Sequence, residues 1–421
     1  MTPFLVNVIG LGYIGLPTAT LVASKGMRVI GVDINSKVVE LVNQGVPPIV
    51  EPELEGLLVH TISSGALVAQ KQPTAANVYM IAVPTPFSEG FEPDLRFVES
   101  AIRSIAPHLV AGSLVIIEST CPVGTTEKMN QLILRERPDL LGDISMAYCP
   151  ERVLPGKTLF ELENNDRVIG GIDLRSAKAA SEFYARFVKG VLLQTDSKTA
   201  EMCKLVENSY RDVNIAFANE LSMICGKAGV DVNALIGLAN HHPRVNILQP
   251  GPGVGGHCIA VDPWFLVHDF PTDSKMIRTA REVNLEKVNW VIDRIESVAR
   301  QWSDLNGRAA TIACFGLTYK PDIDDLRESP ALEITHALIK KGLQVVAVEP
   351  NVPASDGVQI LDVASAVEVA DIAALFVAHH QFKQMVWPSD TVVLDFCALR
   401  PASGVLAAGS VEQRTVPSSR T

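Results

Sequence analysis

The sequence predicts an α/β protein in which two α/β regions, the second smaller than the first, flank a central region of long helices. Three observations support this organisation. Apolar strands followed by helical segments alternate near the N-terminus and again after residue 309. A glycine-rich turn joins the first strand to the first helix. Between the two regions, two long stretches carry apolar residues at helical spacing.

Length and composition indicate several domains. With 421 residues, 47% of them hydrophobic and 20% charged, the chain is globular and too long for a single core. We expect domains at residues 1–195, 196–304 and 305–402. Residues 403–421 are small and polar and lack periodicity, so they are predicted to form a loose tail.

Charge and cysteine usage argue against several classes of protein. A net charge of −11 disfavours a nucleic-acid or anionic-membrane binder, and no apolar run approaches the roughly 18 residues of a membrane span. The glycine-rich turn comes so early that no room is left for a signal peptide. The seven cysteines are scattered without a C-x-x-C pair, which favours reduced thiols over disulfides or a metal site. We therefore expect a soluble cytoplasmic protein without a metal.

The first strand, predicted at residues 4–9, leads into a G-x-G-x-x-G turn and a helix at 16–24. A second strand, at 27–32, ends at Asp33. This context is typical of a Rossmann-type dinucleotide-binding domain, in which the pyrophosphate lies at the helix N-terminus. The acidic residue binds the ribose hydroxyls and repels a 2′-phosphate, so NAD is expected rather than NADP. The turn residues predicted to contact the cofactor are Gly10, Gly12, Tyr13, Ile14 and Gly15.

Two further strands, predicted at 78–83 and 114–118, end in loops that contain Thr85 and Thr120. Ligands of open α/β sheets bind beyond the carboxyl ends of strands, so both threonines are candidates for the nicotinamide side of the site. Ordinary turn chemistry explains them equally well. A strand at 145–148 leads into Glu151 and Arg152, which are either site residues or a surface ion pair.

The central region contains two predicted helices, at 196–226 and 275–302. The first is apolar on most sides but carries Lys204, Asn208 and Arg211 in one narrow stripe. Such a stripe is usually a solvated face, yet on a helix that is otherwise apolar it favours a position facing a cavity. The two helices are also suited to a dimer interface.

A glycine-rich loop separates these helices, with four glycines between residues 251 and 256, followed by Cys258 and Asp262. Glycines allow the backbone to approach a ligand closely, so the loop can present the thiol to a substrate. The alternative is a turn with an incidental buried cysteine.

The C-terminal α/β region begins with a strand at 310–316. Ser329 as N-cap and Pro330 at the first helical position start a helix that Gly342 ends. Further strands are predicted at 344–348, 372–377 and 391–395.

The chain resembles the UDP-glucose/GDP-mannose dehydrogenase family over nearly its whole length. The motifs that carry the resemblance are Gly10-Leu11-Gly12-Tyr13-Ile14-Gly15, Cys149-Pro150-Glu151-Arg152, Gly255-Gly256-His257-Cys258, Lys320 and Arg327-Glu328-Ser329-Pro330. Within the family, residues 201–221 and 242–253 are most similar to UDP-N-acetyl-D-mannosamine dehydrogenases. The UDP-glucose enzymes typically carry a lysine where this chain has Val261, which disfavours UDP-glucose as the substrate.

The resemblance implies a four-electron oxidation of UDP-N-acetyl-D-mannosamine at C6 to the uronate, with NAD as cofactor, for surface polysaccharide precursors. Cys258 would form a thiohemiacetal and then a thioester. The other catalytic residues would be Lys204, Asp262, Glu151 and Asn208, and Arg327 would reach back to the cofactor. The substrate would contact Arg152, Val153, Lys204, Asn208, Arg211, His242, Arg244, Gly255, Tyr319 and Lys320.

The same resemblance assigns NAD to residues 1–195, the cysteine loop and a homodimer contact to 196–304, and the UDP-sugar to 305–402. Three alternatives stay open from the residues. The substrate can be the UDP-N-acetyl-D-glucosamine epimer, the chain can be a two-electron β-hydroxyacid-type dehydrogenase that does not need Cys258, or it can be a non-catalytic NAD-binding regulator. The number of NADH formed per sugar separates the dehydrogenase types from the regulator.

Overall fold

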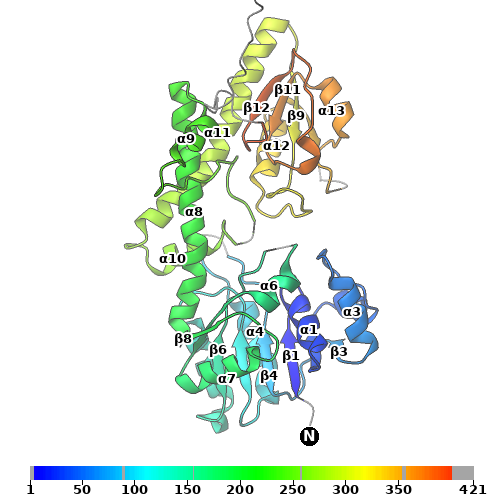
Figure 1. Ribbon diagram of the computed structural model, residues 1–421, viewed down its shortest axis with the longest axis vertical. Helices are drawn as coiled ribbons and strands as arrows, with labels where there is room; N and C mark the ends of the chain where they lie inside the picture. Colours follow the sequence, from blue (N-terminus) through cyan, green and yellow to red (C-terminus); the bar gives the residue numbers. More distant parts are fainter. Residues whose placement is uncertain (1–3, 88–90, 155, 257, 353–356, 401–421) are drawn as a thin grey trace, which may run out of the picture. The chain divides into compact units, whose positions relative to one another are not determined.

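The computed structural model describes residues 4–87, 91–154, 156–256, 258–352 and 357–400 (Figure 1). The chain divides into two compact units. The N-terminal unit comprises Met1–Ser209 and Val261–Lys275, and the C-terminal unit comprises Tyr210–Ala260 and Met276–Thr421. Each unit has its own sheet of mainly parallel strands covered by helices, which confirms the predicted α/β class. The predicted tail, 403–421, lies outside the described residues.

The sheet of the N-terminal unit has the order β3-β2-β1-β4-β5-β6-β7-β8. Its neighbouring strands are parallel, except for the antiparallel pair β6 and β7. The first six strands have the order of a doubly wound dinucleotide fold. The strands are β1 (Leu5–Ile9), β2 (Arg28–Val32), β3 (Leu67–Gln70), β4 (Val78–Ile81), β5 (Leu114–Ile117), β6 (Ser145–Tyr148), β7 (Arg167–Gly171) and β8 (Leu192–Asp196).

The strand register brings the loops of the predicted site to one edge of this sheet. Ile9 of β1 pairs with Ile81 of β4, Ile81 with Ile117 of β5, and Ile117 with Tyr148 of β6. The residues that follow these four strands therefore begin at the same level. Strand β4 ends at Ile81, two residues earlier than predicted, because Pro84 follows soon after and has no N–H to donate to a ladder.

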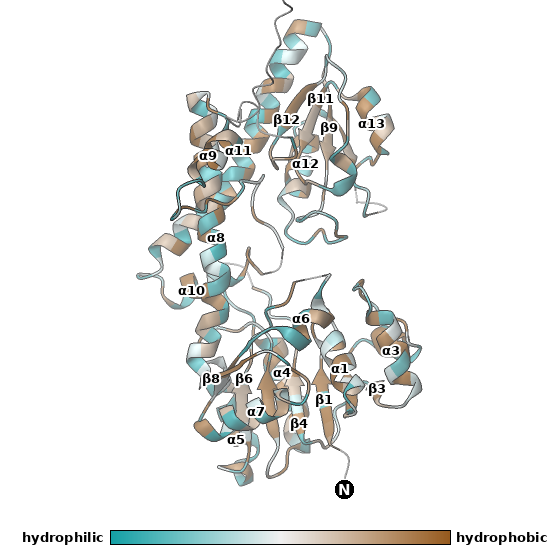
Figure 2. Ribbon diagram, in the orientation of Figure 1, coloured by the Kyte–Doolittle hydropathy of each residue, from teal (hydrophilic) through white to brown (hydrophobic). Residues whose placement is uncertain are grey.

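Helices cover both faces of the N-terminal sheet and form two separate cores. One core contains side chains of α1, α2, α3, α6 and α7, and the other contains side chains of α4 and α5. Figure 2 shows β1 and β4 as predominantly hydrophobic strands between helices with hydrophilic outer faces. These helices are α1 (Gly15–Ser24), α2 (Ser36–Asn43), α3 (Leu54–Ser63), α4 (Arg96–Ile105), α5 (Thr125–Glu136), α6 (Thr158–Asn164) and α7 (Leu174–Tyr184), and α10 (Asp262–Asp269) also belongs to this unit.

The C-terminal unit contains a parallel sheet of order β10-β9-β11-β12. Helices α11 (Lys275–Asn306) and α12 (Pro330–Lys340) pack on one face, and α13 (Val363–Val369) packs on the other. Ser329 caps α12 as predicted, because its side chain accepts a hydrogen bond from the N–H of Leu332. The strands are β9 (Thr311–Phe315), β10 (Gln344–Val348), β11 (Ile372–Leu375) and β12 (Val392–Asp395), and the helices are α9 (Val232–Ala239), α12 (Pro330–Lys340) and α13 (Val363–Val369).

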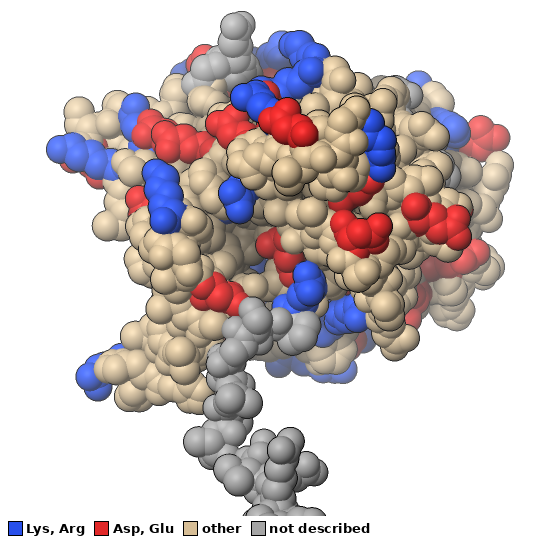
Figure 3. Space-filling view, turned by 90° about the horizontal axis from the view of Figure 1, so that it is seen from above, with Lys and Arg blue, Asp and Glu red and all other residues tan. Residues whose placement is uncertain are grey.

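The two long helices are α8 (Ser197–Ala228) and α11 (Lys275–Asn306), close to their predicted bounds. Helix α8 begins in the N-terminal unit and continues into the C-terminal unit. Within the described part of the chain, none of the helices combines the length and apolar character needed to cross a membrane. On the face drawn in Figure 3, basic and acidic side chains of the described residues are interspersed rather than gathered by sign.

Candidate active site

The glycine-rich turn between β1 and α1 has the geometry that a dinucleotide requires. Gly10 has φ +94°, and a Cβ there would lie 2.5 Å from the backbone oxygen of Ala82. A Cβ on Gly15 would overlap the backbone oxygen of Gly10. At Gly12, by contrast, no described heavy atom lies within 4 Å of the added carbon. The outer glycines are therefore required for packing, and the middle one leaves the backbone open to a pyrophosphate.

Asp33, directly after β2, is held at the same edge of the sheet. Its carboxylate accepts hydrogen bonds from the N–H groups of Leu11 (3.0 Å) and Asn35 (2.8 Å). The first turn of α1 contains no acidic residue. Within that turn, therefore, no negative side chain competes with a phosphate group for the free N–H groups. Tyr13 is 37% exposed and Ile14 is half-buried at this helix start. These residues fit NAD.

Thr85 and Thr120 are both half-buried and follow the carboxyl ends of the neighbouring strands β4 and β5. The starts of the two loops are joined, because the hydroxyl of Ser119 donates to the backbone oxygen of Val83 (2.7 Å). The structure thus places both threonines at the edge that carries Asp33 and the glycine turn. Their contact with the nicotinamide stays a prediction.

Glu151, in the loop after β6, is a buried carboxyl group. The N–H of Val153 donates to this carboxylate. Burial raises the pKa of Glu151 from 4.5 to about 7, against the opposing positive charges of Lys204 and Arg167. Lys204 of α8 is also buried, and its ammonium donates to the backbone oxygen of Glu151 (2.7 Å). A carboxyl group with a pKa near neutrality beside a lysine is suited to proton transfer.

Asp262, the first residue of α10, is another buried carboxyl group of this unit. Asn208 of α8 donates to its Oδ2 (2.5 Å). Burial raises the pKa of Asp262 from 3.8 to about 6, while the charge of Lys204 and the Asn208 hydrogen bond act in the opposite direction. The N-terminal unit therefore brings together Glu151, Lys204, Asn208 and Asp262, and their catalytic roles stay predictions.

The sequence left open whether Glu151 and Arg152 form a surface ion pair with each other. In the structure they do not. The guanidinium of Arg152 pairs with Glu207 of α8 (2.8 Å) and donates to the backbone oxygen of Asp166 (2.6 Å). Adjacent residues of an extended loop point in opposite directions, so one side chain is buried while the other stays near the surface. Arg152 is therefore tied to the same helix that carries Lys204.

In the C-terminal unit, the glycine-rich loop before Cys258 is pressed against the segment that follows β9. A Cβ on Gly255 would lie 2.4 Å from the backbone oxygen of Glu328, and one on Gly256 would lie 2.8 Å from the ring of Tyr319. The N–H of Gly256 donates to the backbone oxygen of Arg327 (3.1 Å). Cys258 is half-buried in the turn that follows. His257 lies outside the described residues.

A buried polar network between α8 and α11 supports the start of this loop, and sequence reasoning did not find it. The N–H of Gly251 donates to Asn219 (2.9 Å), whose amide donates to Asn284 (2.8 Å). Asn284 in turn donates to Asp212 (2.8 Å), which forms a buried ion pair with Arg281 (2.6 Å). The available signal was the presence of amide and charged residues on helix faces that are otherwise apolar.

The remaining predicted residues of the C-terminal unit lie near its surface. Arg211, His242 and Arg244 are exposed, and Lys320 is half-buried. Arg327 forms a two-point ion pair with Asp325 (2.6 Å between Nη2 and Oδ2).

The C-terminal unit also contains a cavity of about 200 Å³, whose lining includes Gly251, Gly253, Thr318, Tyr319, Pro330 and Cys397. Among the described residues, no group of three or more His, Cys, Asp or Glu is arranged to hold a metal ion.

Three sequence models of one family match the chain in order. They are the NAD-binding domain (residues 4–188), the central domain (198–286) and the UDP-binding domain (313–399) of the UDP-glucose/GDP-mannose dehydrogenase family. Together they cover most of the chain.

Individual relatives of the chain share about half of its residues. An NDP-N-acetyl-D-galactosaminuronic acid dehydrogenase of Ralstonia nicotianae is 52% identical over 90% of this chain and 92% of its own length. A UDP-N-acetyl-D-mannosamine dehydrogenase of Yersinia pestis is 52% identical over 90% and 94%. The solved structure of a UDP-D-ManNAc dehydrogenase from Pyrococcus horikoshii is similar with a TM-score of 0.86, at 39% identity over 95% of this chain and 97% of that one.

Proposed function

Because the chain belongs to the UDP-glucose/GDP-mannose dehydrogenase family and is an NAD-dependent UDP-sugar dehydrogenase, we propose that it oxidises UDP-N-acetyl-D-mannosamine at C6 to the uronate. The product would be a precursor of surface polysaccharide. The observation that supports this proposal best is the cluster of Glu151, Lys204, Asn208 and Asp262, in which two buried carboxyl groups have pKa values near neutrality.

The proposed chemistry consists of two oxidations joined by a covalent intermediate. NAD, when bound, accepts one hydride from C6 in each oxidation. In the first, Lys204 and Asp262 take up or relay the hydroxyl proton, and Asn208 and Lys320 hold the reacting end of the sugar. The Cys258 sulfur then bonds to the aldehyde carbon, the C=O π bond opens, and the thiol proton passes to the oxygen, which gives a thiohemiacetal. Loss of the second hydride and of the hydroxyl proton leaves a thioester.

Release of the product requires water to attack the thioester carbon, which breaks the C–S bond and returns the proton to the thiol. Glu151 is suited to assist this step, because a carboxyl group with a pKa of about 7 is substantially ionised at neutral pH and can accept a proton from water. We assign the diphosphate to Arg152, Arg211 and Arg244, since guanidinium groups bind phosphate oxygens with two parallel hydrogen bonds.

The sugar epimer has two candidates beside mannosamine. UDP-N-acetyl-D-glucosamine is the alternative that the sequence left open. The 52% identity to an enzyme named for N-acetyl-D-galactosaminuronic acid adds UDP-N-acetyl-D-galactosamine. Val261 in place of lysine continues to disfavour UDP-glucose.

The deciding experiment offers the purified protein UDP-N-acetyl-D-mannosamine, UDP-N-acetyl-D-glucosamine, UDP-N-acetyl-D-galactosamine and UDP-glucose, each with NAD. We expect two NADH per sugar and a uronate product with the mannosamine substrate. One NADH per sugar would indicate two-electron chemistry, and none with any sugar would indicate a regulator. A uronate obtained faster from another epimer would overturn the proposed substrate but keep the reaction.

We also propose a homodimer formed through α8. Tyr210, Phe217 and Ile224 are 71%, 55% and 56% exposed, and they recur every seven residues, so they lie along one face of the helix. Light scattering at several concentrations tests this, and a monomer at all of them would refute it.

We place the enzyme in the cytoplasm, where cysteines are kept reduced. Three that form no disulfide in the structure are Cys121, Cys203 and Cys225.

A further inference from the structure

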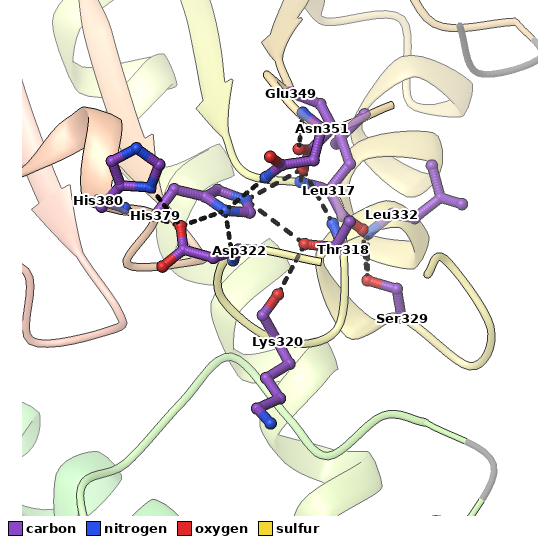
Figure 4. A network of polar contacts seen from close by, with 10 residues as sticks. All are labelled: Leu317, Thr318, Lys320, Asp322, Ser329, Leu332, Glu349, Asn351, His379 and His380. Atoms are coloured by element: carbon purple, nitrogen blue, oxygen red, sulfur yellow. Dashed lines mark hydrogen bonds and ion pairs between the residues drawn. The ribbon is translucent and has the colours of Figure 1, made fainter. Parts of the chain in front are cut away.

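A buried histidine lies at the carboxyl edge of the C-terminal sheet, where three strands end side by side. Phe315 of β9 pairs with Val348 of β10 and with Leu375 of β11. Glu349 directly follows β10, and His379 follows β11 by four residues. Both side chains are buried, and the imidazole has no exposed surface at all. Figure 4 shows their polar contacts.

The hydrogen bonds of His379 define its tautomer. Its Nδ1 lies 3.0 Å from the backbone nitrogen of Asp322, which can only donate, so Nδ1 accepts. The amide nitrogen of Asn351 lies 3.0 Å from the same atom. The proton of the neutral ring therefore resides on Nε2, which faces Oε2 of Glu349 (3.2 Å).

Glu349 is held as a carboxylate that can accept a hydrogen bond from this N–H. Its oxygens also accept from the backbone N–H groups of Leu317 (2.7 Å) and Asn351 (2.9 Å). Burial by itself raises the pKa of Glu349, but hydrogen bonds from His379 and from these N–H groups outweigh it, and the net effect is a lowered pKa. The carboxylate thus fixes both the ring orientation and its tautomer.

The segment that His379 supports carries two of the predicted substrate residues, Tyr319 and Lys320. At its end, Asp322 has a left-handed backbone with φ 61°, which is costly for a residue other than glycine and needs support. The N–H of His380 donates to Oδ1 of Asp322 (3.0 Å), and the hydroxyl of Thr318 donates to the backbone oxygen of Lys320 (2.9 Å). The Lys320 side chain extends away from this network (Figure 4).

The same segment contacts the loop that carries the thiol. A Cβ added to Gly256 would lie 2.8 Å from the Tyr319 ring, so the ring closely covers this glycine, two residues before Cys258. A displacement of Tyr319 would therefore change the support of the thiol loop as well as the substrate contacts.

We propose that His379 is a positioning residue. Glu349 holds its ring in the Nε2–H tautomer, so that Nδ1 accepts a hydrogen bond from the backbone N–H of Asp322. This hydrogen bond fixes the segment that carries Tyr319 and Lys320, and through Tyr319 it positions the loop of Cys258. The catalytic meaning of this proposal rests on the proposed function. The structural link from the imidazole to the thiol loop does not depend on the proposed function.

Two isosteric substitutions separate the two ring nitrogens. In His379→Asn, the amide oxygen occupies the region of Nδ1 and can still accept from Asp322. In His379→Gln, the longer amide reaches the region of Nε2 and can still donate to Glu349, but the acceptor for Asp322 is lost. The loss leaves a part-buried N–H without its partner. We expect His379→Gln to raise KM for UDP-N-acetyl-D-mannosamine about tenfold, and His379→Asn to stay within about threefold of the unmodified enzyme.

A second readout does not depend on catalysis. The rate of alkylation of Cys258 by iodoacetamide is followed by mass spectrometry of its peptide, with Cys203 of the N-terminal unit as internal control. Loosening of the glycine loop should raise the Cys258 rate at least about threefold in His379→Gln and leave it within about twofold in His379→Asn. The rate at Cys203 should not change in either variant.

The outcomes are distinguishable. If the unmodified protein oxidises no UDP-sugar, the proposed function is wrong, and the alkylation rates still decide the role of His379. If the Asn and Gln variants behave alike in both measurements, the positioning role is wrong. Should His379→Gln fail to fold, His379→Asn decides alone, because it keeps the acceptor at the position of Nδ1. A Cys258 alkylation rate raised at least about threefold in His379→Asn would then overturn the proposal.

Discussion

Replacement of Asp262 by asparagine should make the protein more stable at neutral pH while it removes most of the activity. The aspartate is 2% exposed and shares its Oδ2 with the amide of Asn208, 2.5 Å away. Asparagine has nearly the same shape and can keep this hydrogen bond through its own amide oxygen. The substitution therefore removes a buried negative charge without creating a cavity, although it places the two N–H donors of the new amide at the position of Oδ1.

The magnitude follows from the pKa. Folding raises the pKa of Asp262 from 3.8 to about 6, a difference of about two pH units, because burial disfavours the ionised form more than Lys204 and Asn208 favour it. At about 1.4 kcal/mol per pH unit, ionisation of this group destabilises the folded state by about 3 kcal/mol above pH 6. A weaker hydrogen bond in the variant costs about 1 kcal/mol, which leaves a net gain of about 2 kcal/mol.

The sign of the pH dependence provides a separate test. For a carboxyl group with a raised pKa, the folded state binds the proton more tightly than the unfolded state. The destabilising contribution of Asp262 is therefore absent below pH 3.8, grows as the pH rises, and is complete above about pH 6. The difference in stability between the variant and the unmodified protein should increase with pH across this window.

Urea-induced unfolding at several pH values measures the stability, and NADH production measures the activity. Asp269→Asn, at an exposed position of the same helix, serves as the control and should change neither quantity. Loss of a group that transfers or relays protons should reduce kcat by about a hundredfold or more. A variant that is less stable at pH 8, or one that retains near-native kcat, would refute the reasoning about this carboxyl group.

Three further predictions concern the thiol, the cofactor and the phosphates. Cys258→Ala should bind NAD and UDP-sugar but form no uronate, because the proposed thiohemiacetal and thioester require this thiol; two NADH and a carboxylate at a near-native rate would disprove covalent catalysis. Asp33→Ala should weaken NAD binding and improve NADP relative to NAD, measured as the ratio of their kcat/KM values, and an unchanged ratio would contradict the ribose contact. Arg244→Ala and Arg211→Ala should each raise KM for the UDP-sugar by about tenfold or more with little effect on KM for NAD; unchanged sugar kinetics in both would return these arginines to the solvated surface.

Much of the fold was predictable because its signals are local. Strand β1, the glycine turn, the capped helix α12 and the two long helices appear in the structure within a few residues of their predicted positions. The region between β6 and α8 was not predicted in detail, and it contains β7, which runs antiparallel to β6, and the half-exposed edge strand β8. An edge strand lacks the continuous apolar run that identifies a buried parallel strand.

By itself, the sequence determined the α/β class, the dinucleotide turn and the residue types of the site, because glycine spacing, strand runs and helical periodicity act over short distances along the chain. Only the tertiary structure decided that Arg152 pairs with Glu207, that Asn219 supports Gly251, and that His379 holds Asp322. These contacts join residues far apart in the chain. The raised pKa values of Glu151 and Asp262 likewise depend on burial, which is a property of the packed chain and of no short segment within it.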